Sequence, residues 1–280
     1  MPKNRLNLTV ALVLSVNSPV AFAKIAESPP CDTHANTSLQ QPNSIQWSTD
    51  KLSVFLIGGN TDGLGYQKSG FEKAVLDQCM SLTRLNGPED FAFTGADGPG
   101  TATESVGVFK NGTLTYSSSF ITTNRAEFRT SKADAFIAGK EGTGVFIFPE
   151  QGPKAGDTYT VSIKFSQPVT AFSFDLIDIF DTLKDNNPPL RYEVHADEQV
   201  VVLIDGNPLG DDKTGQLNLF DGDNNFKGTM LSGHNFENSI GIIPTEPVNQ
   251  ILIKHHVMSR HVMASARDPH GIDNIAYSTD

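Results

Sequence analysis

Two segments of the chain alternate charged or histidine residues with apolar ones: LRYEVH at 190–195 and ILIKHHVM at 251–258. Successive side chains of a strand point to opposite faces, so each segment predicts a strand with one polar face. If the two strands belong to one sheet, that face carries Arg191, Glu193, His195, Lys254 and His256. The alternative is a solvated sheet face with scattered charges.

The basic side chains of this face would suit an acidic polysaccharide, because arginine and lysine bind carboxylate and sulfate groups through charge-assisted hydrogen bonds. The next segment, KHHVMSRHVMASARDPHG, adds Arg260 and His261 as a basic loop that would grip such a ligand. A solvated loop with satisfied histidines is the alternative, and no HExxH spacing supports a metal site there. We expect ligand contacts at Arg191, Glu193, His195, Lys254, His256, Arg260 and His261.

The same side chains suit the chemistry of a polysaccharide lyase. Such an enzyme neutralises a uronate with a cation or acid and removes the adjacent proton with a base. Arg191, His195, Lys254 and His256 could fill these roles, with Tyr192 as the nearest tyrosine. Strand alternation directs Tyr192 towards the core, however, which counts against that assignment. No GxSxG or SxxK pattern points to nucleophilic catalysis, so enzymatic activity stays open.

An acidic loop, DGDNNFKG at 221–228, is a candidate calcium site. Asp221, Asp223 and Asn225 place oxygen ligands at alternate positions, which is the spacing that a calcium loop uses. Phe226 occupies the place where such loops need glycine, and no glutamate follows at the twelfth position. An Asx-rich turn is therefore the alternative.

The elements that must position these residues have the period of β-strands. DTYTVSIKF at 157–165 alternates an apolar face with a polar face, and AFSFDL at 171–176 repeats the pattern. Further short strands recur with Gly, Asn, Asp and Pro between them. The sequence therefore predicts an all-β fold, an antiparallel β-sandwich of jelly-roll type.

One segment, FEKAVLDQCMSL at 71–82, has helical period instead. Its mostly apolar stripe predicts a short helix that Ser69 could cap. No linker or internal repeat divides the chain after residue 45, so we expect one domain over 46–280.

A family resemblance rests on four features in this order: QPVTAFSFDLID, a strand ending in a DG turn, VNQILIKH and GIDNIAYS. The pattern resembles bacterial exported β-sandwich domains of the kind found in PEP-CTERM-type exoproteins, which resemble carbohydrate-binding jelly rolls. It covers roughly residues 85–280. The family's usual C-terminal Pro-Glu-Pro segment, apolar helix and basic tail are absent, so the resemblance implies fold and export rather than surface sorting. It also implies binding of glycan or matrix.

The last segment, DPHGIDNIAYSTD at 268–280, predicts a turn followed by the final strand. Jelly-roll glycan binders often hold a structural calcium near their terminal strands, and the resemblance would put Asp273 near such an ion. The alternative is structural, with Asp273 and Asn274 hydrogen-bonding local backbone.

The N-terminus predicts export. Lys3 and Arg5 precede a short apolar run, and Ala21-Phe22-Ala23 supplies the small residues of a cleavage site, so residues 1–23 are expected to be a signal peptide. Residues 24–45 read as a flexible leader. No second apolar run is long enough for a membrane span. The net charge of −11 argues against nucleic acid as a partner.

Cys31 and Cys79 are the two cysteines of the chain. In an exported protein a disulfide between them is expected, and it would close a loop of about 48 residues. Two free thiols are the alternative.

These observations favour a secreted, noncatalytic β-sandwich that binds polysaccharide or extracellular matrix, with calcium as a candidate stabilising ion. The alternatives are a secreted polysaccharide lyase, or another polymer-degrading enzyme, on the same fold and a matrix scaffold without a small ligand. Sugar platforms usually use aromatic rings. Trp47, the only tryptophan, lies near the leader, and Tyr66 and Tyr116 are the remaining candidates expected to be exposed.

Overall fold

The computed structural model describes residues 43–60, 67, 69–85, 92–94, 102–122, 128–129, 145–148, 156, 158–177, 179, 190–209, 214–233, 237–258 and 270–280. The predicted signal peptide and most of the leader lie outside these residues. Within the described part, no helix has the length and apolar character needed to cross a membrane.

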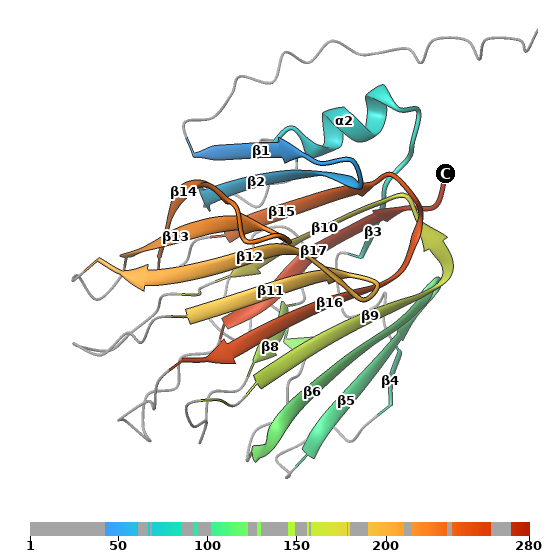
Figure 1. Cartoon of the computed structure of the whole chain (residues 1–280). Helices are drawn as coiled ribbons and strands as arrows, with labels where there is room; N and C mark the ends of the chain where they lie inside the picture. The colour runs from blue at the N-terminus through green and yellow to red at the C-terminus, as the bar shows by residue number, and fades with distance from the viewer. Residues whose placement is uncertain are drawn as a thin grey trace, which may run out of the picture. The chain divides into compact units, whose positions relative to one another are not determined.

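The described strands form two antiparallel sheets, as the sequence predicts (Figure 1). The nine-stranded sheet has the order β14 (Phe226–Gly233), β13 (Thr214–Asp221), β12 (Gln199–Pro208), β11 (Leu190–Ala196), β16 (Val248–Val257), β9 (Thr158–Val169), β6 (Gly112–Thr122), β5 (Ala102–Phe109) and β4 (Ala92–Thr94).

The eight-stranded sheet has the order β1 (Ser44–Ser48), β2 (Leu52–Asn60), β15 (Glu237–Pro244), β10 (Ala171–Ile177), β17 (His270–Ser278), β8 (Val145–Phe148) and β7 (Phe128–Arg129). The short strand β3 (Thr83–Leu85) also pairs with β17. The first described strand, β1, begins at Ser44, just before the predicted boundary at residue 46.

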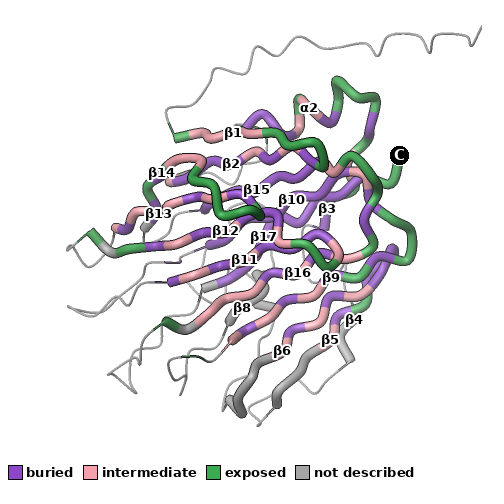
Figure 2. The backbone as a smooth tube through the Cα atoms, in the orientation of Figure 1, coloured by how far each residue is buried: buried purple, intermediate pink, exposed green. Residues whose placement is uncertain are grey.

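The two sheets share one hydrophobic core, because alternate residues of each strand point inwards. In β9 the buried residues are Tyr159, Val161, Ile163 and Phe165, as the alternation predicts. They belong to the same cluster as Phe172, Phe174 and Leu176 of β10 in the opposite sheet. The outer residues of β9 and β16 remain partly accessible, which Figure 2 shows as pink segments between purple ones.

Strand β10 differs, because all seven of its residues are buried. The helix α2 (Phe71–Asp77) explains part of this burial, since Phe71 and Val75 pack with Ala171 of β10 and Ile243 of β15 in a second apolar cluster. The eight-stranded sheet is therefore covered by helix α2 on its outer side at these residues.

Helix α2 is shorter than the predicted segment 71–82. It ends at Asp77, because Cys79 takes a positive φ of 60° and the backbone N–H groups of Cys79 and Met80 bond back to Leu76 and Val75. The N-cap is Gly70 rather than Ser69, although the Ser69 hydroxyl accepts a hydrogen bond from the Phe71 N–H.

Candidate functional site

Strands β11 and β16 are neighbours in the nine-stranded sheet, and their register brings the predicted polar residues together. Arg191 pairs with His256 and Glu193 pairs with Lys254. Burial alternates along β11 from Leu190 to Val194, where Leu190, Tyr192 and Val194 lie in the core. The register thus places Arg191, Glu193, His195, Lys254 and His256 on one face of the sheet, on which His195 is buried.

The carboxylate of Glu193 lies between two histidines of this face. Its Oε2 is 3.1 Å from Nε2 of His195, and its Oε1 is 3.2 Å from Nε2 of His256 on the adjacent strand. Burial alone would raise the pKa of Glu193, but the contacts with the two imidazoles lower it. Burial lowers the pKa of His195, and Lys254 adds to this effect while Glu193 opposes it. Neutral His195 and ionised Glu193 are thus the favoured forms.

Arg191 is held by Asp205 of β12, its register partner on the other side. Nε of Arg191 donates to Oδ1 at 2.7 Å, and Nη2 donates to Oδ2 at 2.9 Å. The side chains of Arg191 and Asp205 remain 38% and 28% exposed. The pairing raises the pKa of Arg191. This edge of the guanidinium is therefore already occupied by a carboxylate.

Tyr192 does not reach this face. It is only 1% exposed and belongs to the hydrophobic core. Its ring stacks on His255 at a centroid distance of 4.6 Å, and Tyr159 stacks on His255 at 5.6 Å. Assigning Tyr192 to a lyase site together with Arg191 and His195 is thus wrong, because the backbone of β11 separates them.

The polar face continues from β11 across β12, β13 and β14. Register partners form the row Thr158, His256, Arg191, Asp205, Asn218 and Thr229. Oδ1 of Asn218 accepts hydrogen bonds from the Thr229 hydroxyl at 3.0 Å and from the Gln216 amide at 3.2 Å. The row thus crosses six strands, with side-chain hydrogen bonds between Arg191 and Asp205 and between Asn218 and Thr229.

Two aromatic residues of this face were missed by the sequence analysis. Phe220 pairs with Phe226, their rings meet edge to face at 5.7 Å, and Phe226 is 61% exposed. Leu203 of β12 is the register partner of Phe220 on β13 and of Glu193 on β11. The two rings therefore lie in the cross-strand row of Glu193, next to the row of Arg191. The alternation in QLNLF predicts Phe220 on the polar face, so the signal was present in the sequence.

The aromatic candidates named from the sequence lie elsewhere. Tyr116 is 1% exposed and buried in the core, so its expected exposure is wrong. Trp47 is half-buried against the same core. Tyr66 lies outside the described residues.

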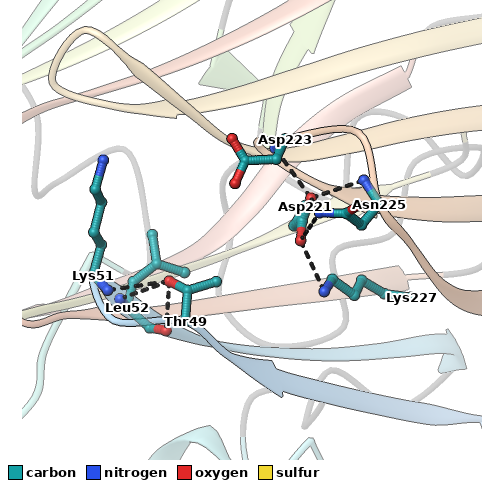
Figure 3. A network of polar contacts seen from close by, with 7 residues as sticks. All are labelled: Thr49, Lys51, Leu52, Asp221, Asp223, Asn225 and Lys227. Carbon is teal, nitrogen blue, oxygen red and sulfur yellow. Dashed lines mark hydrogen bonds and ion pairs between the residues drawn. The ribbon is translucent and has the colours of Figure 1, made fainter.

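Asp221 forms the turn between β13 and β14 (Figure 3). Its Oδ1 accepts hydrogen bonds from the backbone N–H groups of Asp223 and Asn225, and its Oδ2 is 2.8 Å from Nζ of Lys227. Burial would raise the pKa of Asp221, but the hydrogen bonds from Lys227 and Asn225 lower it to about 2. The geometry is that of an Asx turn with a lysine as counter-ion, which was the alternative to a calcium loop.

Asp273 is 3% exposed and lies opposite Asp175 on the neighbouring strand. Its Oδ1 accepts the backbone N–H of Asn274, whose φ is 51°. The Asn274 amide donates to Asp175 at 2.8 Å. Asp273 thus makes the local backbone contact expected of a structural role. Among the described residues, no group of three or more His, Cys, Asp or Glu is arranged to hold a metal ion.

Other predicted residues lie outside the described part of the chain. These are Cys31 and the loop residues Arg260 and His261. The disulfide between Cys31 and Cys79 therefore stays a prediction.

Comparison with known proteins adds little. No family model and no curated protein matches the chain. Among solved structures, the carbohydrate-binding module TmCBM27, described for its specific mannan recognition, aligns with 72% of this chain and 98% of its own. The identity is 15% and the TM-score 0.33, values too low for any inference about a ligand.

Proposed function

We propose that this protein is a secreted, noncatalytic module that binds polysaccharide with the outer face of its nine-stranded sheet. The observation that carries the proposal is the continuity of this face, on which Phe220 and Phe226 adjoin the polar row of Arg191, Asp205 and Asn218. Secretion is supported by the sequence of residues 1–23.

The face has the two kinds of group that a sugar polymer needs. A pyranose ring presents C–H groups, which pack on aromatic rings such as the exposed Phe226. Its hydroxyls donate and accept, and they match amide, hydroxyl and carboxylate side chains. Because cross-strand partners hold one another in place, less side-chain entropy is lost on binding. Extracellular matrix polysaccharide would meet the same requirements.

A polysaccharide lyase is the alternative, and one observation favours it. Glu193 lies between His195 and His256, and a carboxylate that orients an imidazole is a common arrangement for a base. Against it, the Arg191 edge is occupied by Asp205 and Tyr192 lies in the core. The noncatalytic function is therefore preferred.

Affinity electrophoresis of the mature chain in gels that contain polysaccharides tests the proposal. We expect retardation by at least one polymer, no shortening of that polymer, and a loss of about tenfold in affinity for Phe226→Ala. Leu76→Ala is the matched control, because Leu76 is 54% exposed but lies on helix α2. A shortened polymer would establish the enzyme instead. Equal affinities of the Phe226→Ala variant and the wild type would contradict the assignment of this face.

Calcium remains a part of the proposal with its own test. Asp175 and Asp273 are buried carboxylates on adjacent strands, and oxygen ligands of this kind suit calcium. Binding of calcium to the folded state would raise the melting temperature relative to the protein in EDTA. Equal melting temperatures would remove calcium from the proposal.

A further inference from the structure

We infer that the polymer taken by the outer face of the nine-stranded sheet is uncharged, an inference that rests on the polysaccharide-binding function proposed above. Residue types alone suggest an acidic ligand, because Arg191 and Lys254 share this face. The contacts of these side chains indicate the opposite.

Arg191 is the residue best suited to a uronate or sulfate, because its planar fork matches two oxygens. In this protein the Nε–Nη2 edge of that fork already binds both oxygens of Asp205, at 2.7 and 2.9 Å. An acidic sugar would have to displace Asp205 and would then face a carboxylate without its partner. Replacing Asp205 by the ligand's acidic group therefore gains little binding energy, and it leaves that group and Asp205, two like charges, side by side.

The second carboxylate of the face, Glu193, also opposes an anionic ligand. It lies beside Arg191 along β11, and its pKa is lowered, so it is ionised at neutral pH. Lys254 lies directly opposite Glu193 in the register. Its position on β16 is therefore next to a residue that carries a negative charge. Lys164 of β9 is exposed, but its ammonium group is a compact charge and lacks the planar set of donors with which arginine binds two oxygens.

Many of the other described positions of the face carry uncharged hydrogen-bonding groups. Outer positions of the described strands β6, β9, β13, β14 and β16 are occupied by Thr115, Ser117, Thr160, Ser162, Gln216, Asn218, Thr229 and Gln250. Hydroxyls and amides both donate and accept, which is the pairing that sugar hydroxyls require. The exposed ring of Phe226 would pack best on a sugar without a charged substituent.

The charge of the whole chain acts in the same direction. The formal net charge is −11, and removal of the predicted signal peptide would take away only basic residues. A polyanion is repelled by such a field at a distance, whereas a neutral polymer is not. Both the local contacts and the overall charge thus select an uncharged chain.

The test compares neutral polymers (xyloglucan, glucomannan, β-glucan) with polygalacturonate and alginate in affinity electrophoresis. We expect the wild type to bind a neutral polymer, with less than about twofold change in affinity between about 20 mM and about 500 mM salt. Asp205→Asn removes the carboxylate that binds the Arg191 guanidinium. This variant is therefore expected to bind polygalacturonate, and high salt is expected to abolish that binding. Asp77→Asn is the matched control, because it makes the same charge change and releases Lys73 on helix α2.

The outcomes separate this inference from the function on which it rests. Wild-type binding of the acidic polymers alone, or with higher affinity than the neutral ones, overturns the uncharged class and leaves polysaccharide binding intact. No gain by a folded Asp205→Asn variant overturns the role of the Arg191–Asp205 pair in excluding acidic polymers. Binding of no polymer at all overturns the proposed function and this inference together.

Discussion

Arg191 and Asp205 are cross-strand partners whose two parallel hydrogen bonds, at 2.7 and 2.9 Å, join β11 to β12 on the outer face. A bidentate pair of this kind is stronger than a single ion contact, but partial exposure to solvent weakens it. We expect a double-mutant cycle with Arg191→Ala and Asp205→Ala to give a coupling of about 0.5–1 kcal/mol in urea unfolding.

The pair of Lys73 and Asp77 on helix α2 is the control for this cycle, since it is a single, exposed contact four residues apart. Its coupling is expected to be smaller, about 0.3–0.5 kcal/mol. Equal couplings for the two pairs would mean that the bidentate geometry adds nothing to stability.

His195 provides a second prediction, because the groups around it act in opposite directions. Burial lowers its pKa, Lys254 and His256 lower it further, and the hydrogen bond that it donates to Glu193 raises it. We expect an NMR titration to place the pKa of His195 below the ordinary value of 6.5, and Glu193→Gln to lower it again. A higher pKa of His195 in the Glu193→Gln variant than in the wild type would contradict the contact between Glu193 and His195.

The effect of His195 on stability follows from the direction of this shift. Its pKa is lower in the folded than in the unfolded protein, so the unfolded protein binds the proton more readily. The stabilisation is present above the unfolded pKa, about 6.5, and is lost as the pH falls below it. The free energy of unfolding should therefore decrease on mild acidification, and less so in His195→Gln if that variant folds.

Asp221 gives a separate effect in the acid range. Its pKa is lowered from 3.8 to about 2, so its contribution is present above pH 3.8 and is lost as the pH falls towards 2. Asp221→Asn should cost about 1–2 kcal/mol at neutral pH and nothing at pH of about 2. Urea unfolding across this range measures the difference.

Asp223→Asn is the control for Asp221, because it lies in the same turn with its carboxylate directed away from Lys227 (Figure 3). It should leave the free energy of unfolding nearly unchanged at every pH. An equal loss in both variants would assign the effect to the general charge of the turn rather than to the contacts of Asp221.

The sequence was sufficient for the alternation of β9 and β11 and for the shared face of β11 and β16, because a strand fixes side-chain direction every two residues. It could not give Asp205 as the partner of Arg191, since that contact depends on the register of β12 against β11. The acidic-ligand hypothesis rests on residue types alone: they show which charges are present, but only the pairing shows which are neutralised.

The end of helix α2 was beyond sequence reasoning for a related reason. Cys79 continues the apolar stripe, yet its positive φ ends the helical path and its N–H bonds back to Leu76. Such a conformation is unusual for a residue with a Cβ. Tertiary contacts of Phe71 and Val75, rather than the stripe alone, fix the position of this helix.

A substitution at Gly241 tests how helix α2 packs on the sheet. A Cβ at this position of β15 would lie 2.5 Å from the ring of Phe71, closer than any ordinary contact. We expect Gly241→Ala to destabilise the protein by about 1–3 kcal/mol, because the added methyl group forces Phe71 out of its place. In a Phe71→Ala background the ring is absent and only the Cβ of residue 71, 2.7 Å from the added methyl group, still has to shift, so the same substitution should cost less. Urea unfolding of the four variants measures both steps. An equal cost in the two backgrounds would show that the strain at Gly241 does not come from the ring of Phe71.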